Sequence, residues 1–136
     1  MATSTVTYTG NLRTEAKHLV SGCTICTDAP TDNHGKGECF SPTDLVATAL
    51  ASCMLTIMGV SAQAHGFSID GARAEVQKVM GTNPRRIAEI TIDMHIPNSQ
   101  ALDARARRFI ELAAKECPVG YTLHPDTQKT INFIYE

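Results

Sequence analysis

Hydrophobic and polar residues alternate along several short stretches of the chain, which is the pattern of β-strands with one covered face. Val6 and Tyr8 alternate with threonines in the stretch TVTYT, and Gly10-Asn11 predicts a tight turn after it. Residues 12–18 then separate a less polar face from a face with three charged side chains, Arg13, Glu15 and Lys17. Further strands are predicted at residues 23–28, 71–80, 87–96 and 129–136.

One long segment in the first half of the chain carries no charge over residues 45–64. Ser41 is the predicted N-cap of a helix there, Pro42 its first residue, and Asp44 the N3 residue of a capping box. The helix is expected to end near Gly66, since glycine favours the left-handed conformation of a helix C-terminus.

This uncharged helix is long enough to cross a membrane, because a span needs about 20 apolar residues. Its polar side chains argue against a span, and they are Thr48, Ser52, Thr56, Ser61 and Gln63. A helix that is apolar on nearly all sides otherwise belongs in a protein core, where it can cover amphipathic strands. We therefore expect a core helix with more apolar surface than one small domain can cover, which favours a homodimer and no membrane contact.

A second helix is predicted over about residues 99–116, with an apolar stripe that consists of Leu102, Phe109, Ile110 and Ala113. Pro118 biases Cys117 away from helical conformation, so this cysteine is expected at a break in the chain. Alternation within residues 87–96 indicates a half-buried sheet of antiparallel character. The order of strands and helices predicts an α+β fold, with a single domain over residues 1–136.

The composition is that of a globular protein, with 43% hydrophobic and 19% charged residues in 136. The net charge of −2 and the scattered lysines and arginines exclude the clustered basic face of a nucleic-acid-binding protein. The start MATSTVTYTG lacks the basic and apolar regions of a signal peptide. A cytoplasmic location is therefore expected, where thiols stay reduced.

The five cysteines cannot all be paired within one chain, so the role of each must be weighed separately. Cys53 lies in the middle of the uncharged helix, on a face shared with Val46, Ala49, Leu50, Ile57 and Val60. Unpaired cysteines in apolar surroundings mostly behave as small hydrophobic residues, and their thiols are inert. From the residues alone, an inert Cys53 is the favoured interpretation.

Cys23, Cys26, Cys39 and His34 invite a zinc or redox interpretation, because their side chains are metal ligands. On a strand, however, Cys23 and Cys26 point to opposite faces and stand about 10 Å apart. A disulfide requires Cα atoms closer than about 7 Å, so these two cannot bridge. We expect Cys23 to be structural and Cys26 and Cys39 to be incidental, with no metal and no cofactor.

Two motifs change the interpretation of Cys53. The stretch SPTDLVATALASC, which ends at Cys53, and the stretch KECPVGYTLHP around Cys117 resemble the OsmC/Ohr family of osmotically induced and organic hydroperoxide resistance proteins. The resemblance covers essentially the whole chain. It implies an intertwined homodimer in which antiparallel sheets wrap around two central helices, with active sites at the subunit interface. It also implies that Cys53 is the peroxidatic cysteine, that Cys117 resolves it, and that an external dithiol reduces the resulting disulfide.

The family further implies an arginine from the N-terminal strands that holds the thiolate, and a glutamate at the helix start that braces the arginine. Arg13 is the nearest candidate for the arginine, although a gapless match falls slightly before it. The glutamate position is Thr43, which carries no charge. Asp44 is the adjacent carboxylate, but it is turned about 100° around the helix and also suits the capping box. Arg13 and Asp44 are therefore the candidates beside Cys53 and Cys117.

Three functions remain open from the sequence. The first is thiol-dependent reduction of organic hydroperoxides, in a stress or detoxification role. The second is a non-enzymatic module that binds a small hydrophobic ligand at the dimer interface, for which Thr43 is the telling change. The third is a purely structural role for both Cys53 and Cys117.

Overall fold

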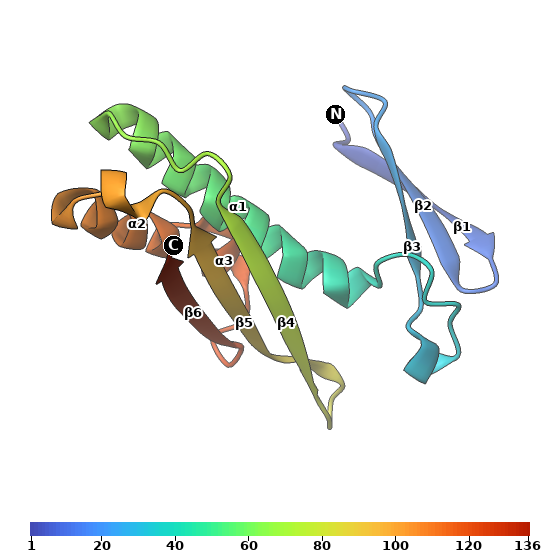
Figure 1. Cartoon of the computed structure of the whole chain (residues 1–136). Coiled ribbons are helices and arrows are strands. Elements are labelled where there is room, and N and C mark those ends of the chain that lie inside the picture. The colour runs from blue at the N-terminus through green and yellow to red at the C-terminus, as the bar shows by residue number, and fades with distance from the viewer. The chain divides into compact units, whose positions relative to one another are not determined.

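The computed structural model describes all 136 residues, and its internal contacts divide the chain into two units, residues 1–46 and 47–136 (Figure 1). The sequence predicted a single domain over residues 1–136, and this stays a prediction. The elements confirm the α+β class, with two small sheets and two long helices.

The first unit contains an antiparallel sheet with the strand order β1 (Ser4–Gly10), β2 (Arg13–His18) and β3 (Thr24–Asp28). The turn between β1 and β2 contains Asn11 and Leu12, both with positive φ. Two such residues are typical of the hairpin turns that match the twist of the strands. Leu12 therefore belongs to the turn, and β2 begins one residue later than the alternation predicted.

Helix α1 (Pro42–His65) begins with the predicted capping box. The Ser41 backbone N–H donates to Asp44 Oδ2, and the Asp44 N–H donates to Ser41 Oγ, each over 3.0 Å. One face of the helix is buried and consists of Ala47, Leu50, Ala51, Met54, Met58 and Ala62. By length and composition alone α1 could cross a membrane, with a mean hydropathy of 1.9. The burial of this face in the hydrophobic core fits a core helix.

The second unit contains a mixed sheet with the order β4 (Arg73–Gly81), β5 (Arg86–Ile96) and β6 (Gln128–Tyr135). The apolar face of β5 is fully buried as predicted, and its residues are Ile90, Ile92, Met94 and Ile96. Strands β4 and β5 are antiparallel, but β5 and β6 are parallel, which the alternation did not predict. The two are parallel because the chain returns through helices between them, and a helical crossover permits parallel pairing.

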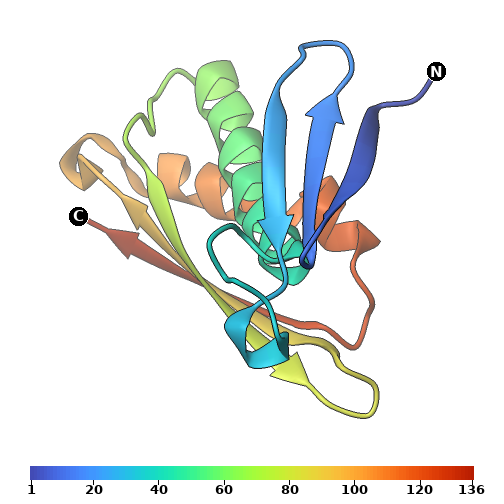
Figure 2. The same cartoon turned by 90° about the vertical axis from the view of Figure 1, so that its right-hand side faces the viewer.

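The second predicted helix, over residues 99–116, is divided into two parts, η2 (Ser99–Ala101) and α2 (Ala104–Lys115), and the short helix α3 (Pro118–Thr122) follows it. Helix α2 starts late because Asp103 caps it, its side chain accepting a 2.8 Å hydrogen bond from the Ala106 N–H. Pro118 ends the helical run as predicted but also begins α3, since proline fits the first helical position. Figures 1 and 2 show α1 and α2 on the same side of the β4–β5–β6 sheet.

Candidate functional site

Cys53 and Cys117 are 64 positions apart in the sequence and lie together in the second unit. Cys53 is half-buried on α1, and Cys117 is 1% exposed at the N-cap position of α3. Besides burial, the neighbouring Cys53 side chain raises the pKa of the Cys117 thiol, so the two thiols lie close enough to interact. The Cys117 Sγ also lies 3.9 Å from the Leu50 carbonyl oxygen on α1. The end of α2 and the start of α3 thus hold one sulfur against the middle of α1.

The surroundings distinguish the two thiols. Burial raises the pKa of Cys117, and the neighbouring Cys53 side chain raises it further. The backbone N–H groups of Gly120 and Val119 lower it, but by less. Cys117 therefore stays protonated at neutral pH and can donate its proton to an acceptor. The arrangement leaves Cys53 as the more accessible sulfur of the pair.

The surroundings of Cys53 on α1 differ from the covered apolar face on which an inert thiol was expected. That interpretation placed Cys53 on a covered apolar face with Val46 and Val60. In the structure these two residues are 38% and 59% exposed, and the buried face of α1 lies to one side of them. Cys53 packs against the edge of the core rather than within it.

A pocket of about 340 Å³ lies beside Cys117 in the second unit. Its walls come from α1, α2, α3 and β6, and the lining residues are Met54, Ala114, Lys115, Cys117, Gly120, Tyr121, Lys129 and Ile131. The volume lies within the range of small-molecule sites, whose walls are mostly apolar with a few polar groups. The Lys129 ammonium donates to the Gly120 carbonyl over 3.3 Å, so part of the rim is already hydrogen-bonded.

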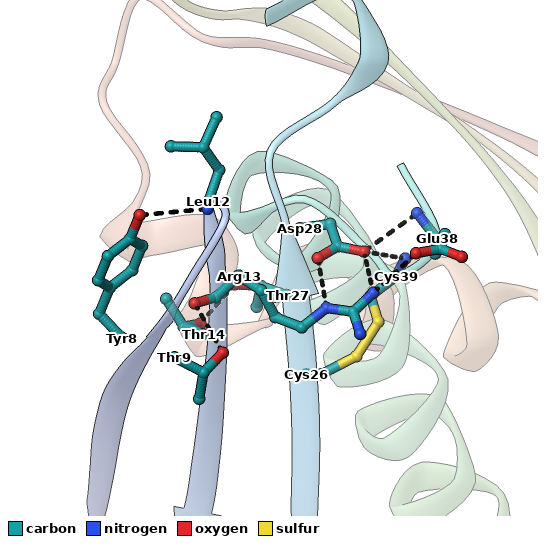
Figure 3. A network of polar contacts seen from close by, with 10 residues as sticks. All are labelled: Tyr8, Thr9, Leu12, Arg13, Thr14, Cys26, Thr27, Asp28, Glu38 and Cys39. Carbon is teal, nitrogen blue, oxygen red and sulfur yellow. Dashed lines mark hydrogen bonds and ion pairs between the residues drawn. A yellow bond between two sulfur atoms is a disulfide. The ribbon is translucent and has the colours of Figure 1, made fainter. Parts of the chain in front are cut away.

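Arg13 lies in the first unit, where two carboxylates hold its guanidinium (Figure 3). Its Nε donates to Asp28 Oδ1 over 2.7 Å and its Nη2 to Asp28 Oδ2 over 2.8 Å. Nη2 also donates to Glu38 Oε1 over 3.1 Å. This fork of parallel hydrogen bonds is the strong, geometrically specific form of an arginine–carboxylate pair. Arg13 is therefore an ordered part of a cluster. It is not a freely solvated side chain, which was the other interpretation of an arginine on the polar face of β2.

The carboxylate of Asp28 is the centre of this cluster. Asp28 is buried, with only 1% of its surface exposed. Besides Arg13, its Oδ2 accepts the backbone N–H groups of Glu38 and Cys39, both over 3.1 Å. The hydrogen bond from Arg13 is the main cause that lowers the pKa of Asp28 from 3.8 to about 2, against the effect of burial. The same contacts raise the pKa of Arg13. Both groups stay charged over the physiological range.

Sequence reasoning did not find Asp28 and Glu38. The sequence contained a signal that Asp28 lies near Arg13, because the turn after His18 fixes how β2 and β3 pair. That pairing places Arg13 directly opposite Asp28 in the antiparallel register. Glu38 lies in an irregular loop, and no pattern in the sequence indicated that its carboxylate meets Arg13.

Asp44 occupies the cap of α1, with its carboxylate on the Ser41 N–H. The Thr43 hydroxyl lies 3.2 Å from the Ser41 hydroxyl. The carboxylates that meet Arg13 in the first unit are thus Asp28 and Glu38, which come from β3 and the following loop.

The prediction that Cys26 and Cys39 are incidental is wrong, because the structure joins them in a disulfide (Figure 3). Cys23 and Cys26 do not bridge, as expected, but the loop after β3 folds back on the strand and brings Cys39 to Cys26. The Cα atoms of Cys26 and Cys39 are 6.1 Å apart, within the range that a disulfide spans. Cys23 is exposed and free, so the expectation of a structural role for it is also wrong.

The comparisons place the fold among known proteins. The family model described as OsmC-like protein matches residues 35–132. A crystal structure from Psychrobacter arcticus 273-4, described as that of an osmotic stress induced and detoxification response protein, is 50% identical, with a TM-score of 0.92 over 98% of this chain and 96% of that one. Among curated proteins no sequence matches this chain.

More distant structures share the fold. An OsmC-like protein from Mycoplasma pneumoniae is 21% identical, with a TM-score of 0.80 over 97% of this chain and 94% of that one. An organic hydroperoxide resistance protein from Vibrio cholerae, with captopril bound in one of its active sites, is 15% identical, with a TM-score of 0.74 over 98% and 92%. The family model spans most of the chain and a relative of half-identical sequence spans nearly all of it, so the chain belongs to the OsmC-like family.

Proposed function

We propose that this protein reduces organic hydroperoxides in a stress or detoxification role, with Cys53 as the peroxidatic and Cys117 as the resolving cysteine. The observation that carries the proposal is the proximity of the two thiols, of which Cys117 is buried and Cys53 only half-buried. A half-buried sulfur can meet a substrate, and a buried partner thiol beside it can trap the oxidised product. Two cysteines placed in this way are suited to form a transient disulfide.

The reaction follows from the chemistry of the two sulfurs. The Cys53 thiolate attacks the terminal oxygen of the hydroperoxide, the O–O bond breaks, and the alcohol leaves after taking up a proton. Cys53 is then a sulfenic acid. The Cys117 sulfur attacks the Cys53 sulfur, its proton leaves with the hydroxyl group as water, and a disulfide forms. An external dithiol returns two electrons and two protons and is itself oxidised to a disulfide.

The comparisons support this role at the level of the family. The half-identical relative is described as an osmotic stress induced and detoxification response protein, and the Vibrio cholerae structure is described as an organic hydroperoxide resistance protein. The apolar side chains around α1 suit an organic peroxide better than hydrogen peroxide. We propose for Arg13 the role that the family resemblance implies, that of the positive charge that favours the Cys53 thiolate. Asp44 is proposed to act on this site only through the start of α1, which its carboxylate caps.

We also propose that the protein is a cytoplasmic homodimer. Val60 is 59% exposed on α1, a helix whose opposite face lies in the core. A large apolar residue in that position is a candidate for burial against a second copy. Val60→Lys should lower the dimer fraction measured by light scattering, whereas Gln63→Lys, at an exposed polar position of the same helix, should not. Equal dimer fractions in both variants would rule out this face.

The test of the reaction is the intact mass of the protein after one equivalent of cumene hydroperoxide, followed by peptide mapping. We expect a Cys53–Cys117 disulfide in the wild type and a Cys53 sulfenic acid that persists in Cys117→Ser. Cys53→Ser should not turn over the peroxide. Undiminished turnover in Cys53→Ser would reject the assignment.

The pocket beside Cys117 favours one second candidate, a module that binds a small hydrophobic ligand. It predicts a co-purified ligand in native mass spectrometry and no Cys53–Cys117 disulfide after peroxide. A Met54→Trp substitution would fill the pocket and should displace such a ligand.

A further inference from the structure

We propose that Cys26–Cys39 is a second thiol–disulfide site, which exchanges with a small dithiol and thereby opens or closes the cluster around Arg13. Nothing in the reaction of Cys53 and Cys117 uses this disulfide. It lies in the first unit, in a loop that runs from β3 to the start of α1. Both cysteines are only half-buried, so a thiolate can reach a sulfur.

The loop between the two cysteines has little else to hold it. Its short helix η1 (Thr31–Asn33) contains no buried residue, and most of residues 31–38 are exposed. No apolar side chain of this loop belongs to the hydrophobic core. The disulfide and a few polar contacts therefore keep the end of the loop on β3. A segment with so few buried contacts opens at low free energy once its covalent tie is cut.

The polar contacts converge on Asp28 and connect the disulfide to Arg13. Asp28 lies two residues after Cys26 on β3, so the two side chains share a face of the sheet with Arg13 of β2. The Asp28 N–H donates to the Phe40 carbonyl over 3.1 Å. Its carboxylate accepts the N–H groups of Glu38 and Cys39. Figure 3 shows the disulfide beside this set of bonds, with Arg13 on the same carboxylate.

Opening the disulfide should therefore change Arg13. A dithiol attacks one sulfur of Cys26–Cys39 to form a mixed disulfide, and its second thiol then releases a protein dithiol and a cyclic disulfide. Two electrons and two protons pass to the protein. Residues 38–40 are then free to leave β3, which takes Glu38 away from Arg13 and two backbone donors away from Asp28. Arg13 keeps only the Asp28 carboxylate.

The expected location of the protein adds to the argument. In reducing compartments a disulfide is rare, and those that form are usually transient and catalytic or redox-sensing. Because Cys39 is two residues before the N-cap Ser41, the site also lies at the start of the helix that carries Cys53. Any effect of the exchange on peroxide turnover rests on the proposed function, but the exchange itself does not.

The experiment exposes the folded protein to graded ratios of reduced to oxidised dithiothreitol, blocks free thiols by alkylation, and maps each cysteine by mass spectrometry. Hydrogen exchange of the backbone N–H groups of Glu38 and Cys39 is measured in parallel. We expect Cys26 and Cys39 to become labelled together, reversibly, while the amides of β5 remain protected. The two loop amides should lose protection over the same range of ratios.

The controls separate this site from the reactive pair. In Cys26→Ser, the backbone amides of Glu38 and Cys39 should exchange hydrogen as in the reduced protein at every dithiothreitol ratio. Cys23→Ser should behave as the wild type. Peptide mapping follows Cys53 and Cys117 separately, so failure of the peroxidase proposal leaves this result readable. Labelling of Cys26 and Cys39 only on global unfolding would make the disulfide a fixed structural link and overturn the proposal. Reversible labelling with unchanged protection of the Glu38 and Cys39 amides would overturn the coupling to Arg13.

Discussion

The two units of this chain each hold a pair of cysteines, and the pairs differ in bonding because their surroundings differ. Cys26 and Cys39 join a strand to an exposed loop and are linked covalently. Cys53 lies on α1 and Cys117 between α2 and α3, where a hydrophobic core already holds the helices, and both remain thiols. All the buried hydrophobic residues lie between Ala47 and Cys117, in the second unit.

The first unit has the opposite character. Its buried residues are polar or charged, namely Thr27, Asp28 and Ser41. It is held by strand pairing, the Arg13–Asp28 pair and the disulfide, as small folds with little core often are. The comparison teaches that two cysteines are linked covalently where apolar packing is missing, and that they remain thiols where packing supplies the stability.

The largest expected effect separates the pairs by activity. Cys53→Ser should reduce turnover of an alkyl hydroperoxide to background, a loss of more than about a thousandfold, because loss of a covalent nucleophile typically costs at least that. Cys26→Ser should lose far less turnover, since its sulfur forms no bond in the reaction and the disulfide acts on turnover only through Arg13. Consumption of peroxide in a coupled dithiol assay measures both. Equal losses in the two variants would erase the distinction between the pairs.

The next effect separates the pairs by stability. Cys26→Ser removes a link between residues 13 positions apart, and loop-closure entropy then predicts a loss of about 3 kcal/mol in the free energy of unfolding of the first unit. Hydrogen exchange of the backbone amides of β2, measured at increasing urea concentrations, gives this loss. Cys26→Ser/Cys39→Ser should lose no more than the single variant, because one bond is broken in each. Cys23→Ser is the matched control, and an equal loss there would contradict the prediction.

A third effect concerns the pH dependence of disulfide formation between Cys53 and Cys117. The pKa of Cys117 is raised above its ordinary value of 9.0, so its thiolate is a minor fraction that rises about tenfold per pH unit up to about pH 9. The rate at which the Cys53 sulfenic acid disappears should follow that rise. Quenching with a sulfenic acid trap at timed intervals between pH 6 and roughly pH 9 measures it. A rate that levels off at neutral pH would exclude Cys117 as the group that loses the proton.

The smallest expected effect concerns acid stability of the first unit. The pKa of Asp28 is lowered to about 2, so its contribution is present above the unfolded pKa near 4 and is lost as the pH falls toward 2. Because the Arg13 side chain is 33% exposed, solvent screening limits this contribution. Asp28→Asn should flatten the pH dependence of unfolding between about pH 4 and pH 2. An unchanged slope in this variant would place the acid sensitivity elsewhere.

The sequence predicted those elements whose signals are local. The cap at Ser41 and Asp44, the buried face of β5 and the break at Pro118 were each indicated by residues close together in the chain. Two features were missed, for different reasons. The late start of α2 depends on which of two nearby residues, Ser99 or Asp103, caps the helix. The parallel pairing of β5 and β6 depends on the crossover that joins strands far apart in the chain.

The same division applies to the candidate site. The motifs around Cys53 and Cys117 identified both cysteines and the family, because the residue types and their spacing are properties of the sequence. Only the tertiary structure decided that these thiols meet, that Arg13 binds Asp28 and Glu38, and that Cys26 pairs with Cys39. Hydrogen bonds and disulfides act over a few ångströms, and which distant residues come that close is set by how the strands and loops fold back on one another.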